Sequence, residues 1–252
     1  MTTSIRLPQS SLKEILDSID ELVKFSEGAA IDLNLTTDDG CVLIYAHPPS
    51  MSMVHELVPS DDVEISTDEE GERICLNPND LMDVVTKAEE GMLEIEFLDY
   101  DYVVRYEEEE IFSEPLTLRL RRFVDTEFEE PPEVGDLKSL GSLNRISLSR
   151  ALNVMSTVSP VVKVTVDKGM LSLKVEDKVS GEGEVSPKLT NSEVEYFEAW
   201  YSIEPPIQFL RKITSDENVD LLITENSTLV LEVESDNKHS RLFLAPRVEE
   251  PQ

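Results

Sequence analysis

The residue types that most often carry out catalysis are present, but their spacing does not define a catalytic site. Three histidines, His47, His55 and His239, share no pattern with an acid or a nucleophile. The chain has 53 acidic residues, so carboxylate pairs arise by chance and none stands out as a general acid and base. A Gly-x-Ser-x-Gly motif and a phosphate-binding glycine loop are both missing. The sequence therefore predicts a binding protein rather than an enzyme.

Metal, cofactor and membrane sites are not indicated either. Cys41 and Cys75 form no Cys-x-x-Cys motif and no cluster with histidine, so we expect no zinc site. The acidic stretches 37–40 and 67–72 lack the spacing of a calcium-binding loop. No apolar run approaches the ~18 residues of a membrane span, and the N-terminus lacks the apolar core of a signal peptide. We expect no cofactor, no membrane partner and a location in a reducing cytoplasm.

The charge of the chain is extreme: it has 22 basic and 53 acidic residues, which gives a net charge of −31. Acidic chains are often disordered, but here apolar residues make up 40% of the sequence and recur in periodic runs. The acidity therefore indicates the surface of a folded protein. Such a surface suits high salt, or it repels or mimics nucleic acid. Taken alone, the net charge argues against a DNA partner.

An internal repeat is the most informative pattern in the sequence. Residues 6–26 predict a short strand, a helix cap at Ser10 or Ser11 and an amphipathic helix. The alternating runs 31–37 and 41–46, joined by Asp-Asp-Gly, predict a hairpin, and 51–58 predicts the next strand. The expected buried face of this helix consists of Leu12, Ile15, Leu16, Ile19, Leu22 and Val23.

The same order returns about 139 residues later. Residues 145–158 predict a strand residue, a cap at Ser147 or Ser149 and a second amphipathic helix. The runs 161–167 and 170–177 predict another hairpin. The expected buried face of this helix consists of Leu152, Met155 and Val158.

A further pair of copies is formed by residues 74–90 and 201–217, each of which predicts a strand and a helix with proline in its first turn, Pro78 and Pro205. Each is followed by three alternating runs that predict an antiparallel meander. These runs are 92–99, 102–110 and 116–123 after the first, and 219–226, 227–235 and 240–246 after the second.

Together these patterns predict an α+β fold of two pseudo-repeated domains. Each domain would consist of two β-α-β-β-β units, with the helices on one face of antiparallel sheets, because each helix has a single apolar stripe to bury. The predicted domains are 1–120 and 137–252, and the acidic, proline-containing segment 121–136 is predicted to be an extended connecting loop.

This organisation resembles the DNA sliding clamps of archaea and eukaryotes, the proliferating cell nuclear antigen family. The most specific match is Leu-Ala-Pro-Arg-Val at 244–248, which is similar to the family's Leu-Ala-Pro-Lys/Arg-Ile ending. Residues 45–54 resemble a family loop, although His47 stands where that loop usually has aspartate. The resemblance covers essentially the whole chain and marks a divergent member, and the acid load resembles a clamp of a haloarchaeon or of one of its viruses.

The resemblance implies a non-enzymatic ring of three identical, head-to-tail subunits whose helices line a hole around double-stranded DNA. Such a ring tethers DNA polymerase and other replication and repair clients, which bind through short peptides, and an ATP-driven clamp loader opens it. Two alternatives stay open. The chain could be an acidic adaptor or DNA mimic that never encircles DNA, or one subunit of a heterotrimeric clamp.

The resemblance also places candidate sites. The expected DNA-facing residues are Lys13, Lys24, Lys87, Arg150, Arg211 and Lys212. Of these, Arg211 and Lys212 are favoured, followed by Arg150, because acids outnumber bases on the first helix and would pair with its lysines.

The expected protein contacts are a peptide pocket and two strand edges. The pocket would be built from Ala46, His47, Phe128, Pro131, Val134, Thr228, Ala245, Pro246, Arg247 and Val248. The edges, expected at 116–122 and 171–180, would join subunits with the help of ion pairs. Their candidate contact residues are Leu116, Leu118, Arg119, Arg121, Leu173, Lys174 and Lys178.

Overall fold

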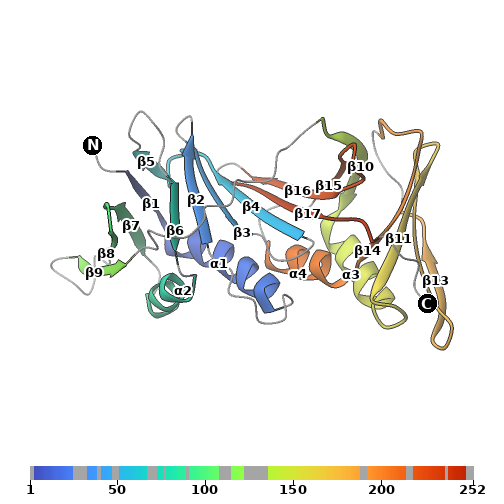
Figure 1. The fold of residues 1–252 in the computed structure, drawn as a ribbon, viewed down its shortest axis with the longest axis horizontal. Coiled ribbons are helices and arrows are strands. Elements are labelled where there is room, and N and C mark those ends of the chain that lie inside the picture. The colour runs from blue at the N-terminus through green and yellow to red at the C-terminus, as the bar shows by residue number, and fades with distance from the viewer. Residues whose placement is uncertain are drawn as a thin grey trace. The chain divides into compact units, whose positions relative to one another are not determined.

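The chain divides into two compact units. Unit 1 comprises Met1–Pro48, Val54–Pro131 and Asp236–His239, and unit 2 comprises Pro49–Met53, Pro132–Ser235 and Ser240–Gln252. Figure 1 labels their helices and strands. The computed structural model describes residues 3–24, 33–38, 41–46, 51–66, 73–76, 78–88, 91–107, 115–121, 136–187, 192–213, 218–235 and 238–247.

Unit 1 contains the order strand, helix, three strands twice. The first copy is β1 (Ser4–Pro8), α1 (Gln9–Lys24), β2 (Leu33–Asp38), β3 (Cys41–Ala46) and β4 (Met51–Leu57). After the short β5 (Glu64–Ser66), the second copy is β6 (Arg73–Leu76), α2 (Pro78–Lys87), β7 (Met92–Phe97), β8 (Asp101–Glu107) and β9 (Leu116–Arg121). One antiparallel sheet has the strand order β5-β1-β7-β8-β9, and β4, β3, β2 and β6 follow one another in a second sheet.

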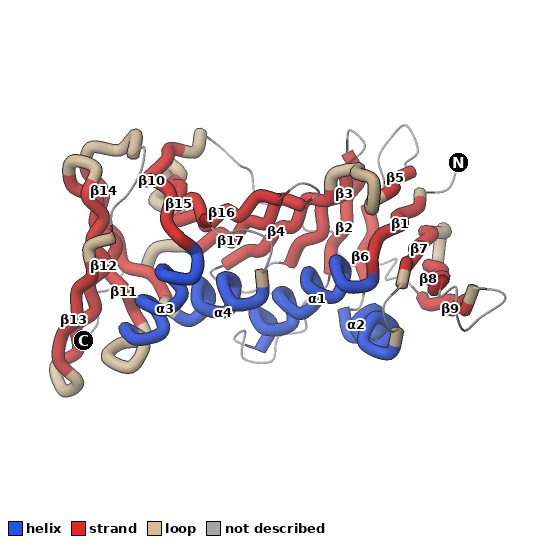
Figure 2. Tube along the Cα trace, turned by 180° about the vertical axis from the view of Figure 1, so that it is seen from behind, coloured by secondary structure: helices blue, strands red, loops and turns tan. Residues whose placement is uncertain are grey.

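The helices of unit 1 bury one face each, as their sequence period requires. Leu12, Ile15, Leu16 and Ile19 of α1 are all at most 1% exposed, and Figures 1 and 2 show α1 and α2 on the same side of the unit 1 strands. Because α1 begins at Gln9, Ser10 and Ser11 lie inside the helix and the predicted serine cap is wrong. The Gln9 side chain is buried and donates to the backbone oxygens of Val85 (2.6 Å) and Ala88 (3.3 Å), which ties α1 to the end of α2.

Unit 2 contains the same order twice again. Its first copy is β10 (Lys138–Asn144), α3 (Arg145–Met155), β11 (Val161–Asp167), β12 (Met170–Asp177) and β13 (Gly181–Val185). Its second copy is β14 (Tyr196–Ser202), α4 (Glu204–Lys212), β15 (Asn218–Ile223), β16 (Leu229–Ser235) and β17 (Lys238–Leu244). One antiparallel sheet has the order β13-β12-β11-β14, and β10, β15, β16 and β17 follow one another in another sheet.

The start of α3 differs from the sequence prediction. The helix begins at Arg145, and the Asn144 side chain accepts a hydrogen bond from the backbone nitrogen of Ser147 at 2.9 Å. Asparagine is as effective a cap as serine, so the predicted caps at Ser147 and Ser149 are wrong by several residues. The buried face of α3 consists of Leu148, Leu152 and Met155, whereas Val158 lies in the turn after the helix and is half-buried.

The predicted fold class is confirmed: the chain is α+β, with antiparallel sheets and pseudo-repeated strand-helix-strand units. The predicted hairpins form with Asp38 paired to Cys41 and Asp167 paired to Met170. The second of these turns has φ values of 51° at Lys168 and 75° at Gly169, the left-handed backbone that a two-residue hairpin needs.

The predicted domain boundaries stay predictions, because most of the connecting loop, 122–135, lies outside the described residues. None of the helices in the described ranges is long and apolar enough to cross a membrane. Within the same ranges, no three His, Cys, Asp or Glu side chains gather where they could hold a metal ion.

Candidate nucleic-acid and protein interfaces

Two exposed arginines on the helices of unit 2, Arg150 and Arg211, have no acidic partner among the described residues. Arg150 on α3 is exposed and makes no hydrogen bond or ion pair with any residue that the structure describes. Arg211, in the last turn of α4, is exposed and donates through Nη2 to Oδ1 of Asn153 on α3, which is a neutral partner. Lys212 follows it and is half-buried. The structure thus brings Arg150 and Arg211 to the same pair of packed helices.

Arg145 is a basic residue of α3 that the sequence analysis did not include. Its Nη1 atom donates to the backbone oxygen of Leu210 at 2.5 Å. That oxygen belongs to the last turn of α4, where a cation is favourable because carbonyl groups lack helical partners. Arg145 therefore fixes α3 against α4, and no sequence motif marks this contact.

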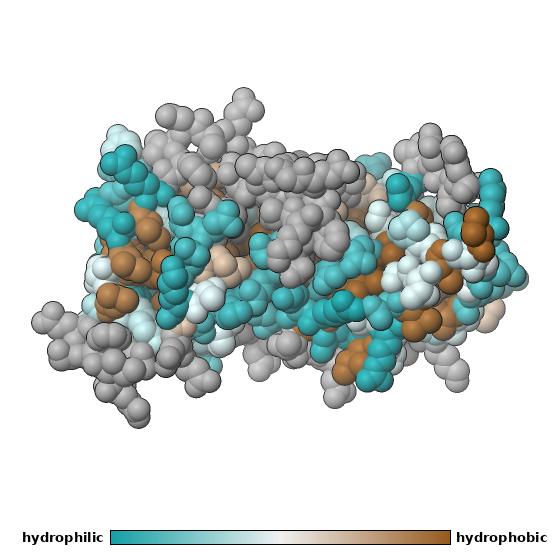
Figure 3. Space-filling view, turned by 90° about the horizontal axis from the view of Figure 1, so that it is seen from below, coloured by the Kyte–Doolittle hydropathy of each residue, from teal (hydrophilic) through white to brown (hydrophobic). Residues whose placement is uncertain are grey.

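Two of the three expected DNA-facing lysines of unit 1, Lys13 and Lys87, are paired with acids of their own helices. The Nζ atom of Lys13 lies 2.6 Å from Oδ2 of Asp17, and that of Lys87 lies 3.3 Å from Oδ2 of Asp83. Both are i,i+4 pairs on helix surfaces. Lys24 ends α1, and its side chain lies outside the described residues. Figure 3 shows a largely hydrophilic described surface interrupted by hydrophobic patches.

The edge strand β9 carries the subunit-contact residues predicted for the first domain. Among the described strands it pairs with β8 alone, and it stands last in the order of its sheet. Leu116 and Leu118 are 46% and 37% exposed. Arg119 is also exposed and contacts Asp101 on β8 at 2.7 Å, and Arg121 is exposed at the strand end. The edge position of 116–121 agrees with the prediction.

The predicted edge in the second domain is wrong. Most of the run 171–180 belongs to β12 (Met170–Asp177), which pairs with β11 on one side and with β13 on the other. Among the described strands the edge is β13, Gly-Glu-Gly-Glu-Val, with Glu182 and Glu184 exposed. Leu173 is accordingly only 3% exposed. Sequence reasoning missed β13 because two glycines and two glutamates have low strand propensity, so only the pairing defines it.

Two other predicted contact residues lie close to this edge. The Nζ atom of Lys174 lies 2.9 Å from Glu176 and 3.9 Å from Glu182, and the hydrogen bond to Glu176 is the main reason why the pKa of Lys174 is raised. Lys178 is exposed in the turn between β12 and β13.

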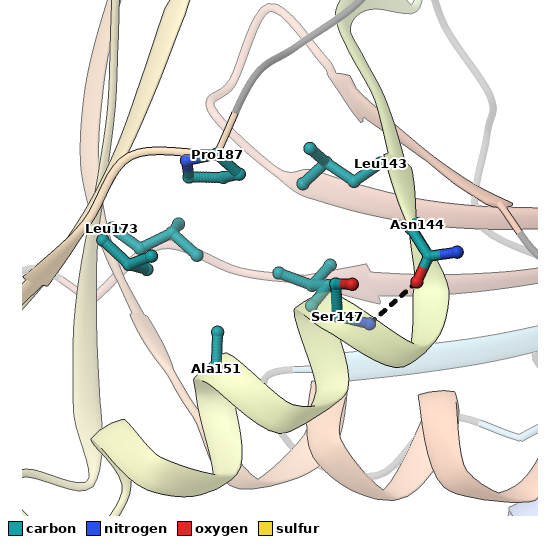
Figure 4. A pocket seen from close by; sticks show the side chains of 8 residues that line it. Leu143, Asn144, Ser147, Ala151, Leu173 and Pro187 are labelled. Atoms are coloured by element: carbon teal, nitrogen blue, oxygen red, sulfur yellow. Dashed lines mark hydrogen bonds between the residues drawn. The ribbon is translucent and has the colours of Figure 1, made fainter.

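An apolar pocket of 260 Å³ lies in unit 2 between the start of α3 and the β12–β13 edge. Figure 4 shows Leu143, Ala151, Leu173 and Pro187 around the space, with the Asn144–Ser147 cap hydrogen bond at its margin. Its complete lining is Leu143, Asn144, Ser147, Leu148, Ala151, Leu173, Val185 and Pro187. Almost all of this surface is apolar, so the pocket fits a hydrocarbon side chain rather than a charged ligand.

The predicted peptide pocket is only partly within the described residues. His47, Phe128, Pro131, Val134 and Val248 lie outside them. Ala46 ends β3 and is fully buried, and Thr228 is half-buried in the turn before β16. Ala245 and Arg247 are exposed, Pro246 is half-buried, and the backbone nitrogen of Arg247 donates to the oxygen of Trp200 on β14 at 2.8 Å. The segment after β17 thus lies beside β14.

A buried polar cluster in unit 1 was not predicted. His55 on β4 is fully buried, and its Nε2 atom lies 2.8 Å from Oγ of Ser18 on α1. The Lys238 ammonium, whose side chain is 6% exposed, contacts Glu14 at 2.9 Å. Ser18 also donates to the backbone oxygen of Ile15, so its hydroxyl proton is engaged and the Ser-His pair is not arranged as a nucleophile and base.

No family model matches the chain, and no curated protein sequence matches it. Solved structures define the class: the chain has the two-domain clamp fold of the proliferating cell nuclear antigen (PCNA) proteins.

Two structures illustrate the similarity. One is A. fulgidus PCNA with the C-terminal region of FEN-1 bound, at a TM-score of 0.77, 14% identity and coverage of 100% of both chains. The other is the PCNA2–PCNA3 complex from Sulfolobus tokodaii, at a TM-score of 0.75, 15% identity and coverage of 98% of this chain and 100% of that chain. At such low identity the similarity establishes the fold.

Proposed function

We propose that this protein is a DNA sliding clamp subunit, which assembles head to tail into a closed ring of three copies around duplex DNA and tethers replication and repair enzymes. It has no catalytic activity of its own in this proposal. The observation that carries the proposal is a pair of edge strands with opposite charge, β9 and β13, in a chain whose whole length has the clamp fold.

The two edges are chemically complementary. Strand β9 presents Arg119 and Arg121, and strand β13 presents Glu182 and Glu184. Edge strands have unpaired backbone groups that seek a partner strand. Pairing β9 of one copy with β13 of the next would satisfy these groups and place arginine opposite glutamate. Because the two surfaces differ, the contact is heterologous, and it makes a ring when each step is one third of a turn.

The apolar pocket beside β13 supports the same contact. Leu116 and Leu118 of β9 are exposed in the single chain, and the pocket next to β13 has an apolar lining. A leucine of the neighbouring copy has the size and chemistry to fill it. Burying a leucine side chain contributes about 1.5–3 kcal/mol, which adds a hydrophobic component to the ion pairs.

Clients would bind at the segment that follows β17. Ala245, Pro246 and Arg247 continue beside β14, and Pro246 cannot donate a hydrogen bond to a neighbouring strand. The similar A. fulgidus structure holds the C-terminal region of FEN-1. We infer that a client peptide uses this segment, together with the predicted residues of the connecting loop, and that an ATP-driven loader opens the ring.

A trapping experiment tests encirclement without a loader. The protein is mixed with a linear duplex biotinylated at both ends, and streptavidin then blocks the ends. A ring is expected to stay on the blocked duplex through a high-salt wash and to leave when a restriction enzyme cuts between the blocks. Loss of the protein in the wash from blocked and open duplex alike would refute encirclement and leave an acidic adaptor or DNA mimic as the better description.

A mixed ring is the second candidate, because the S. tokodaii structure is a complex of two different PCNA subunits. Light scattering separates the two candidates. A mass of three chains for the purified protein supports the homotrimer, whereas a monomer that becomes a trimer only with a second clamp protein supports the heterotrimer.

The acidic composition bears on the cellular environment of the protein. A net charge of −31 is suited to a salt-rich archaeal cytoplasm, in which the Debye length falls to about 3 Å at 1 M salt. We place the protein in such a cell or in one infected by a virus.

A further inference from the structure

The helix layers of the two units differ in charge. In unit 1, α1 and α2 together carry three basic residues and six acidic ones. In unit 2, α3 and α4 together carry four basic residues and one acidic one, Glu204. A chain with 53 acids therefore keeps one pair of helices almost free of them.

The pairing of the basic side chains differs in the same direction. Lys13 and Lys87 in unit 1 are neutralised by Asp17 and Asp83 one helical turn away. A phosphate would have to compete with these carboxylates for each ammonium group. Asp80 and Asp83 are exposed on α2 and would repel a phosphate directly.

In unit 2 the guanidinium groups of Arg150 and Arg211 are available to an anion. Arg150 is exposed and has no partner among the residues that the structure describes. Arg211 is held by the neutral side-chain oxygen of Asn153, and Asn153 lies one turn from Arg150 on α3. Arginine binds phosphate through several donors at once. The hydrogen bond to Asn153 orients Arg211 and leaves its positive charge uncompensated.

We propose that the duplex is held by the unit 2 helices alone, through phosphate contacts of Arg150 and Arg211, while the helices of unit 1 face the duplex without binding it. This inference rests on the proposed clamp function. In a ring of three copies it gives three phosphate-binding faces that alternate with three neutralised ones. The expected contact is independent of base sequence, because it involves only the DNA backbone.

The test compares two matched double variants by fluorescence anisotropy of a labelled linear duplex over a range of salt concentrations. Arg150→Gln with Arg211→Gln removes two charges from unit 2, and Lys13→Gln with Lys87→Gln removes two from unit 1. Each phosphate contact contributes about −0.9 to the slope of log K against log salt. The unit 2 variant is expected to weaken binding at least tenfold at low salt and to flatten the slope by about 2, whereas the unit 1 variant changes affinity less than about twofold. Equal losses in the two variants would overturn the inference.

A gain of binding provides a test that misfolding cannot imitate. Asp17→Asn with Asp83→Asn should release Lys13 and Lys87 for phosphate, so the inference predicts tighter binding and a steeper slope. Asp61→Asn with Asp99→Asn makes the same change in net charge at exposed loop positions and should have a much smaller effect. Similar gains in both variants would show that net charge, and not the unit 1 helix face, controls binding, which would contradict the proposal.

Failure of this inference is distinguishable from failure of the clamp function. The trapping experiment on blocked duplex reports encirclement, which does not depend on the salt slope. A wild-type protein that is trapped but shows equal losses in the two charge variants keeps the clamp function and refutes the contact asymmetry. A wild-type protein that binds the duplex at no salt concentration refutes the inference as well.

Discussion

His55 illustrates how a titratable residue can be structural. Its ring is fully buried against Ser18, and its pKa is lowered from 6.5 to about 3, first because burial disfavours the charged ring and second because Lys238 repels it. Two of the groups that act on it are the Ser18 hydroxyl and the Lys238 ammonium, which is itself paired with Glu14. The imidazole stays neutral in the folded protein at every pH at which the protein is expected to work.

This burial predicts a dependence of stability on pH. Because the folded-state pKa lies below the unfolded-state value, the contribution of His55 is complete above pH 6.5 and is lost as the pH falls towards 3. Within that window it adds about 1.4 kcal/mol per pH unit to the slope of the unfolding free energy. His55→Gln should remove this part of the slope in urea unfolding at pH 4 to 7. The substitution His239→Gln, at a half-buried histidine, is the control, and identical slopes for His55→Gln and wild type would contradict the prediction.

The buried Lys238–Glu14 pair leads to a second residue-level prediction. The Lys238 side chain is 6% exposed and that of Glu14 19%, and removing one partner of a buried ion pair typically costs about 3–5 kcal/mol. Lys238→Met should therefore lower the free energy of unfolding by that order, and adding Glu14→Gln should restore part of it. The coupling is measured with a double-mutant cycle in urea. Additive effects of the two substitutions would show that the pair is not coupled.

At the level of elements, the opposite charges of β9 and β13 lead to a prediction about reversing these charges by substitution. In the proposed contact, Glu182→Arg with Glu184→Arg puts like charges opposite Arg119 and Arg121 of the next copy, so the proposed ring should dissociate into single chains. Arg119→Glu with Arg121→Glu in the same protein should restore it. The mass is measured by light scattering. Asp61→Arg with Glu225→Arg, at exposed positions away from both strands, is the control.

Persistence of the trimer in the glutamate-to-arginine variant would show that β13 is not the contact strand. Failure of the fourfold variant to reassemble would show that charge complementarity does not specify the partner.

The elements also show what the sequence could and could not predict. Hydrophobic periodicity was sufficient for the four helices and the hairpins, because the buried residues of α1 recur at helical spacing and Asp-Lys-Gly marks a turn. Hydrophobic periodicity was insufficient where strand pairing or backbone geometry determines whether an element forms and where it begins. Strand β13 exists because β12 offers it an edge, and α3 starts early because the Asn144 side chain reaches the backbone nitrogen of Ser147.

For the candidate sites as well, the sequence could identify some residues but not the contacts that they make. The basic residues Arg150 and Arg211 could be found from sequence, because they stand on helices that are poor in acids. Their contacts could not be found, since the role of Asn153 depends on the packing of α3 against α4. Likewise, the sequence could not show that Leu173 lies on an internal strand, because β13, which forms the edge, was not predicted.

At the level of the whole molecule, the net charge of −31 predicts that stability rises with salt. Repulsion among surface carboxylates destabilises the compact state, and salt screens it. The pairs of Arg6 with Glu64 and of Arg105 with Glu96 will weaken in salt, but 53 acidic residues outnumber 22 basic ones, so repulsion among carboxylates is the larger effect. The urea midpoint should therefore increase between 0.05 and 1 M KCl. A midpoint that stays constant or falls over this range would indicate that the surface ion pairs dominate.

The hydrogen bond from Arg247 to Trp200 has a practical consequence. Trp200 is the only tryptophan in the chain, and it adjoins the segment at which client peptides are proposed to dock. The indole is partly exposed and has Lys163 over its ring at 5.6 Å. Binding of a client peptide at this segment should therefore change the intrinsic fluorescence of Trp200, which can be measured on the unlabelled protein.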